Sequence, residues 1–99
     1  MAVQGDKYTF NEKNIGIAPD EPGVYALYDG NAPIYYGSST KSIRDRLQSH
    51  FDGDDGPSTK GASSYRRETC NNGLQREREL LQAFKNQNKA LPRCNDVIP

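Results

Sequence analysis

Residues 23–28 carry an alternating pattern of side chains that predicts a β-strand with two distinct faces. Turn-forming residues follow at 29–31, and residues 34–37 are again aromatic and β-branched, so the two segments are expected to form a β-hairpin. The first strand is expected to place Val24, Ala26 and Tyr28 on one face, and Tyr25 and Leu27 on the other.

Two later segments have the apolar spacing of amphipathic helices. The first is expected to run from Ser42, a suitable N-cap, to about Phe51. The second covers residues 74–86, after a break at residues 71–73 that can cap it. The apolar stripes consist of Ile43, Leu47 and Phe51 in the first helix, and of Leu74, Leu80, Leu81 and Phe84 in the second.

Outside these segments the sequence has no regular apolar period. We expect an extended lead-in over residues 1–21, because Pro19 and Pro22 oppose a helix there. A chain of 99 residues has room for one domain, which we expect over residues 22–99. The remaining segments are a loop at residues 52–61, a short strand or a helical turn at residues 64–70, and a loop tail at residues 89–99 held by Pro92.

Composition excludes several classes of protein. Only 33% of the residues are hydrophobic, and no apolar run approaches the roughly 20 residues that a membrane span needs. Cys70 and Cys94 have no CxxC spacing, and two cysteines are too few for a disulfide scaffold. His50 is the only histidine, so a zinc site would lack ligands. We therefore expect a reduced, cytoplasmic protein.

The formal net charge of zero argues against a partner bound mainly by electrostatics, such as nucleic acid. The charges are unevenly distributed, however. Residues 1–34 have two lysines against five carboxylates, a net charge of −3, whereas residues 35–76 have seven basic against five acidic side chains, a net charge of +2. The distribution leaves room for a small basic face.

Tyr25 and Tyr35 lie on the two adjacent strands of the predicted hairpin. Such a pair more often packs, with the hydroxyl groups on polar partners, than takes part in chemistry. On the following helix, Arg46 lies just outside the apolar stripe and His50 follows one turn later, whereas Arg44 points away from Arg46. This pair can be an ordinary solvated helix face, or it can bind a phosphate oxygen and orient a water.

Helical phase separates the two carboxylates of the later helix. The apolar side chains of this helix stand three, four and seven residues after Glu77, so Glu77 shares their direction while Glu79 faces the opposite way. A carboxylate on an apolar face is costly to bury unless it has a partner such as a metal or an arginine. Glu77 is therefore the candidate site residue, with a structural ion pair as the alternative.

These segments together resemble the GIY-YIG nuclease superfamily, over residues 22–95. The resemblance implies an α+β fold in which a small three-stranded mixed sheet, containing the β-hairpin, is flanked by helices. The motifs that carry it are Gly-Val-Tyr at 23–25, Tyr-Tyr-Gly at 35–37, Arg46 with His50, Glu77 on a later helix, and Pro-Arg-Cys-Asn at 92–95.

The resemblance implies a divalent-metal-dependent DNA endonuclease that uses one Mg²⁺ or Mn²⁺ ion held by Glu77. Tyr25 would act as the base, supported by a hydrogen bond from Tyr35, and Arg46 would stabilise the developing charge. The matched site residues are Tyr25, Tyr35, Arg46, His50, Glu77 and Asn95, and the expected DNA contacts are Ser38, Lys41 and Arg44.

DNA is the implied partner, and the protein would be nucleoid-associated when bound to it. An additional DNA-binding domain or a partner protein would supply the specificity. Two other classes remain open from the sequence. One is a nucleic-acid-binding or protein-interaction module of the same fold without turnover, which the zero net charge and Asp45 favour. The other is a structural protein in which the tyrosines and Glu77 only pack.

Overall fold

The computed structural model describes residues 2–54, 59 and 61–99, and its centre is a four-stranded sheet. In the described residues every strand pair is antiparallel, and the strand order is β1-β4-β2-β3. The expected sheet of three mixed strands is therefore wrong in both number and direction. The strands are β1 (Tyr8–Thr9), β2 (Gly23–Asp29), β3 (Ala32–Ser39) and β4 (Ser64–Thr69).

The expected extended lead-in is also wrong, because it contains strand β1 and the short helix α1 (Glu12–Gly16). The Asn11 side chain caps α1 by accepting a hydrogen bond from the Asn14 amide. Pro19 lies beyond the end of α1, where a proline does not interrupt helical hydrogen bonds. A helix of five residues is too short for its apolar period to be recognised in the sequence.

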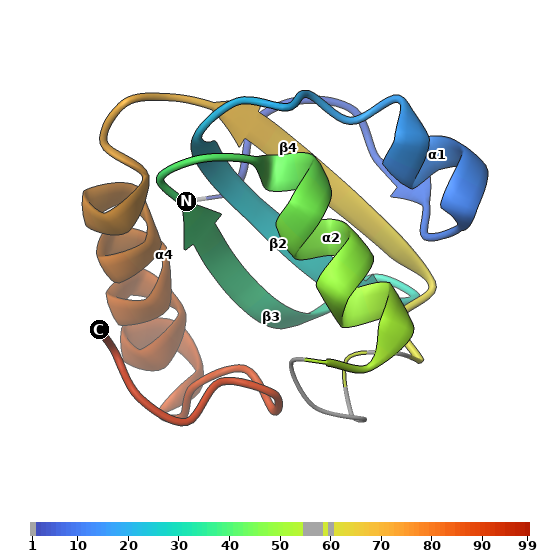
Figure 1. The fold of residues 1–99 in the computed structure, drawn as a ribbon. Coiled ribbons are helices and arrows are strands. Elements are labelled where there is room, and N and C mark those ends of the chain that lie inside the picture. Colours follow the sequence, from blue (N-terminus) through green and yellow to red (C-terminus); the bar gives the residue numbers. More distant parts are fainter. Residues whose placement is uncertain (1, 55–58, 60) are drawn as a thin grey trace.

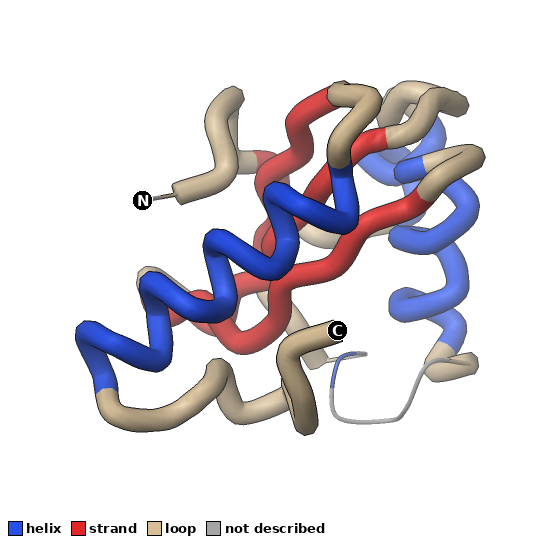
Figure 2. Tube along the Cα trace, turned by 90° about the vertical axis from the view of Figure 1, so that its left-hand side faces the viewer, coloured by secondary structure: helices blue, strands red, loops and turns tan. Residues whose placement is uncertain are grey.

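Helices α2 (Ile43–Asp52) and α4 (Gly73–Asn88) cover opposite faces of the sheet. Figure 1 shows α2 in front of β2 and β3 with α4 at their side, and the turned view of Figure 2 places the strands between α4 and the other helices. As expected, Ser42 caps α2, with its hydroxyl accepting from the Asp45 amide. Side chains from a helix are therefore available on each face of the sheet.

The two faces of β2 belong to two separate cores, as its alternation predicts. Tyr25 and Leu27 pack with α1 and α2, whereas Val24, Ala26 and Tyr28 pack with α4. A β-bulge in the hairpin disturbs this alternation on β3, where Ile34 and Tyr35 both reach the core under α2.

Helix α4 differs from the prediction in two details. Leu74, assigned to its apolar stripe, is 44% exposed, whereas Gly73, Glu77, Leu80 and Leu81 of the same helix are buried. The N-cap residue, Asn72, makes no side-chain capping bond. The undecided segment at residues 64–70 is a strand, since β4 pairs with β2 over its whole length.

Part of the expected loop at residues 52–61 lies outside the described residues. Cys70 and Cys94 are free, as expected, and both are partly buried. In the described part of the chain, no helix is both long enough and apolar enough to cross a membrane.

Candidate active site

Three aromatic side chains, Tyr25, Tyr35 and His50, meet on the face of the sheet that α2 covers. The Tyr25 hydroxyl lies 2.7 Å from His50 Nε2, and both side chains are completely buried. Tyr35, expected to support Tyr25, has its ring centroid 6.2 Å from that of Tyr25 and 4.7 Å from that of His50. The hydrogen bond identified on the Tyr25 hydroxyl is thus to His50.

Gly37 provides the space that the Tyr25 phenol occupies. It stands directly opposite Tyr25 in the β2–β3 register, and a Cβ atom here would lie 2.4 Å from the Tyr25 hydroxyl oxygen. The same Cβ would lie 2.8 Å from Cε2 of Tyr35. A glycine in the Tyr-Tyr-Gly motif therefore lets the two phenols lie against the strand.

The other nitrogen of His50 contacts a residue that the sequence analysis did not identify. His50 Nδ1 lies 3.1 Å from the hydroxyl oxygen of Thr59, which is buried. Contacts at both nitrogens hold the imidazole ring in one orientation. Thr59 lies in the segment expected as a loop, which has no apolar period, so no sequence signal pointed to it.

Glu77 is buried, as helical phase predicted, while Glu79 is exposed. Oε1 of Glu77 accepts a hydrogen bond of 2.6 Å from the Ser38 hydroxyl. Burial raises the pKa of Glu77 above its ordinary value, and the Ser38 hydrogen bond and the positive charges of Arg46 and Arg78 oppose this rise. The carboxylate is therefore held in place by the Ser38 hydroxyl, in surroundings that disfavour its charge.

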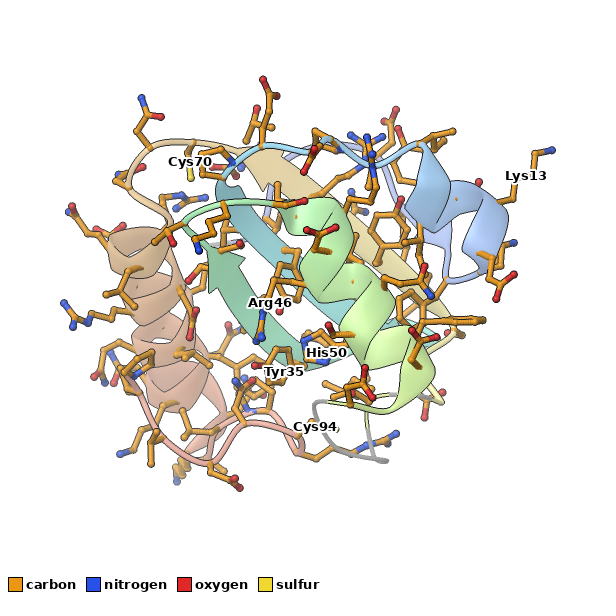
Figure 3. All side chains as sticks on the ribbon, in the orientation of Figure 1. Lys13, Tyr35, Arg46, His50, Cys70 and Cys94 are labelled. Carbon is orange, nitrogen blue, oxygen red and sulfur yellow. The ribbon has the colours of Figure 1, made fainter. Side chains whose placement is uncertain are left out.

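The edge strand β3 brings the two halves of the site together. Tyr35 projects toward α2, whereas Ser38 lies opposite Val24 and faces α4 and Glu77. Figure 3 shows Arg46, Tyr35 and His50 on the same side of the sheet, between α2 and α4. Because β3 is an edge strand, side chains from both faces can reach around it.

A cavity of about 260 Å³ opens at this edge. Glu77 and Tyr35 line it together with residues of the C-terminal tail, which include Asn95 and Asp96. No cluster of three or more acidic, histidine or cysteine side chains occurs in residues 2–54, 59 and 61–99. A cation here would thus have Glu77 as its main protein ligand, which suits a hard ion that keeps most of its waters.

Asn95 contacts the backbone of β3. Its Oδ1 accepts from the Tyr36 amide at 3.0 Å, and its Nδ2 donates to the Tyr36 carbonyl at 3.1 Å. The Cys94 amide donates to the Ile34 carbonyl beside it. Asn95 therefore pairs with the strand edge like one residue of a further strand and fixes the tail beside Tyr35.

The three expected DNA contacts have different surroundings. Lys41 is exposed and available to a partner. Arg44 Nε donates to the Ala18 carbonyl at 2.9 Å, so this side chain ties α2 to the lead-in. The Ser38 hydroxyl is bonded to Glu77. Of the three, only Lys41 points to solvent without such a structural contact among the described residues.

Comparisons with known proteins agree on one family. A sequence model described as the GIY-YIG catalytic domain matches residues 21–91. UvrABC system protein C of Moorella thermoacetica is 37% identical over 54 residues, which are 54% of this chain and 9% of that protein. The protein of the same name from Saccharopolyspora erythraea is 44% identical over 36 residues, 36% of this chain and 5% of that protein. The chain thus spans less than a tenth of these relatives.

The fold also matches a solved structure. The GIY-YIG N-terminal endonuclease domain of UvrC from Thermotoga maritima, bound to magnesium as its catalytic divalent cation, aligns with a TM-score of 0.62. The alignment covers 85% of this chain and 93% of that one, at 24% sequence identity. At this level of identity the likeness establishes the α+β fold.

Proposed function

Because the chain belongs to the GIY-YIG family of nuclease domains, we propose that it is a DNA endonuclease that hydrolyses phosphodiester bonds with the help of a divalent metal ion. The observation that carries the proposal is the convergence of a buried tyrosine–histidine pair, an arginine and a desolvated glutamate around the edge of β3.

Tyr25 is the proposed base toward the attacking water. A phenol with a pKa near 10 is a poor base at neutral pH, so its own proton must first be taken up elsewhere. His50 Nε2, at 2.7 Å from the phenol oxygen, is placed to hold that proton. Thr59 supports this role, because its contact with Nδ1 keeps the imidazole ring turned toward Tyr25.

Arg46 is the proposed group that stabilises negative charge on the phosphoryl oxygens. An arginine offers forked donors that match two phosphate oxygens. The positive charge of Arg46 also lowers the pKa of Glu77 against the effect of burial, which supports a shared site for the two side chains. Removal of a comparable charge-stabilising donor in an enzyme typically costs about 10²–10³ in rate.

Glu77 is the proposed ligand of one Mg²⁺ or Mn²⁺ ion, with Asn95 acting only through the backbone of β3. The donor set fits such an ion, since one carboxylate faces a cavity that has room for water and a phosphate oxygen. When bound, the ion would polarise the phosphoryl group and neutralise charge on the leaving oxygen. Further domains or a partner protein would select the DNA, because the formal net charge of this chain is zero and favours no strong electrostatic binding.

A plasmid-nicking assay tests this function. We expect Mg²⁺-dependent nicking by the wild type, loss of nicking in Glu77→Ala and Arg46→Ala, and no loss in Glu79→Ala, which removes an exposed carboxylate from the same helix. Salt-sensitive DNA binding without cutting would instead identify a binding module. Loss of activity in Glu79→Ala but not in Glu77→Ala would contradict the assignment of the metal ligand.

A further inference from the structure

The contact between Ser38 and Glu77 has the features of a built support rather than a chance surface bond. The Ser38 hydroxyl can donate only one hydrogen, and it lies 2.6 Å from Oε1 of a carboxylate that is 9% exposed. This distance falls in the range of charge-assisted O–H···O⁻ bonds, which are about twice as strong as neutral ones.

The backbones behind both residues are held close together. Ser38 lies on β3, where it pairs with Val24 of the central strand β2. Helix α4 approaches both strands closely at Gly73. A Cβ atom at this position would lie 2.8 Å from the Gly23 carbonyl oxygen on β2 and 3.3 Å from Cβ of Ser38 on β3. The first turn of α4, which leads into Glu77, therefore has little freedom to move away from Ser38.

This arrangement leaves the two oxygens of Glu77 unequal. Oε1 is occupied by the serine hydroxyl, so the second oxygen is the one available as a metal ligand. A chelate through both oxygens would require the metal and the hydroxyl to share Oε1. Mg²⁺ usually takes a single oxygen from a carboxylate and keeps several waters, whereas Ca²⁺ takes more ligands and accepts bidentate carboxylates.

We propose that Ser38 is a positioning residue that restricts Glu77 to one-oxygen coordination and thereby makes the site prefer Mg²⁺ to Ca²⁺. This inference rests on the proposed function of Glu77 as a metal ligand. It replaces the expected role of Ser38 as a DNA contact.

Calorimetric titration of the full chain with MgCl₂ or CaCl₂ alone, without DNA, tests the inference. We expect Ser38→Ala to weaken Mg²⁺ binding about tenfold, at the lower end of the effect of losing a residue that orients a metal ligand. Ca²⁺ binding should weaken less or strengthen, so the Mg²⁺-to-Ca²⁺ affinity ratio should fall. Ser38→Thr, which keeps the hydroxyl, should restore the ratio.

Ser64→Ala is the matched control, because it removes a half-buried serine hydroxyl from strand β4, and this hydroxyl has no hydrogen bond among the described residues. If Ser38→Ala does not fold, Ser38→Cys replaces it, since its thiol is a weaker donor of similar size. An unchanged affinity ratio in a folded Ser38 variant would overturn the inference while leaving Mg²⁺-dependent nicking, and with it the proposed function, intact. A wild type that neither binds Mg²⁺ nor nicks DNA would overturn both.

Discussion

At the residue scale, the polar groups of the site are buried and yet bonded. Tyr25 and His50 are fully covered, and their 2.7 Å contact satisfies two groups that would be costly to bury alone. Glu77 also accepts a hydrogen bond from Ser38, but its burial still raises its pKa and so disfavours its charged form. Tyr25 and His50 are thus held by their contact with each other, whereas a bound cation would favour the charged form of Glu77.

Tyr25→Phe should lower the nicking rate by about 10²–10⁴, the usual contribution of a general base. The ring volume is kept, so the loss of stability should be limited to about 1–3 kcal/mol for leaving His50 Nε2 without this partner. Tyr65→Phe is the control. It removes a 2.6 Å hydrogen bond to the Asn14 carbonyl at a distance from the site, and it should destabilise the fold without slowing nicking in a folded sample.

The buried state of Glu77 predicts a pH-dependent stability of the metal-free protein. Burial raises its pKa above 4.5, so the folded chain binds this proton more tightly than the unfolded chain. Its contribution is then most favourable below pH 4.5 and is lost as the pH rises through the folded-state pKa. Glu77→Gln should therefore raise the Tm at pH 7.

Thermal melts in EDTA at pH 7 and at about pH 4 measure this effect. The advantage of Glu77→Gln should shrink as the pH falls, because the wild-type carboxyl becomes neutral as well. Glu79→Gln, at an exposed position of the same helix, should show no such pH-dependent advantage. An equal gain in Tm for Glu77→Gln at both pH values would argue against a raised pKa.

At the element scale, the edge strand β3 holds the site together. One of its faces presents Tyr35 and Gly37 to the side of α2, and the other presents Ser38 to α4. The bulge at Ile34 changes which residues point to each side. A slip in the β2–β3 register would therefore separate the tyrosines from one another and Ser38 from Glu77.

Gly37→Ala should destabilise the protein by about 1–3 kcal/mol, the usual cost of overpacking. The added methyl group would lie 2.4–2.8 Å from atoms of Tyr25 and Tyr35, whose rings must then move. Urea unfolding measures the loss, and nicking should fall with it. Gly16→Ala is the control, because nothing lies within 4 Å of its added Cβ atom, and it should leave stability unchanged or slightly raised.

At the scale of the whole molecule, the C-terminal tail completes the site. Asn95 binds the β3 edge, and residues 96, 97 and 99 line the same cavity as Glu77. Arg78 Nε also donates a hydrogen bond to the Pro99 carbonyl. The tail thus closes an edge that would otherwise expose unpaired backbone groups of β3.

Asn95→Ala should release the tail from β3. Two hydrogen bonds of about 1 kcal/mol each are lost, so hydrogen–deuterium exchange should become faster at the Tyr36 and Cys94 amides. Asn86→Ala, which changes an exposed asparagine of α4, should leave these amides unaffected. Unchanged exchange in Asn95→Ala would mean that other contacts hold the tail.

Local periodicity determined the burial of most of these side chains, Leu74 being the exception. The alternation of residues 23–28 correctly assigned the two faces of β2, and helical phase correctly placed Glu77 inside and Glu79 outside. Both results depend only on the side-chain period within a single strand or helix, which residues close in the sequence specify. Elements too short to show a repeat, α1 and β1, were missed for the same reason.

Only the tertiary structure decided the partners of these side chains. Ser38 and Glu77 are 39 residues apart, and Tyr25 and His50 are 25 apart, so their hydrogen bonds exist because separate elements pack around β3. The sequence by itself determined the residue types, the helix and strand periods and the burial of one carboxylate. Strand order, the bulge and the close approach of α4 at Gly73 decided which groups meet, because such contacts depend on packing between distant segments.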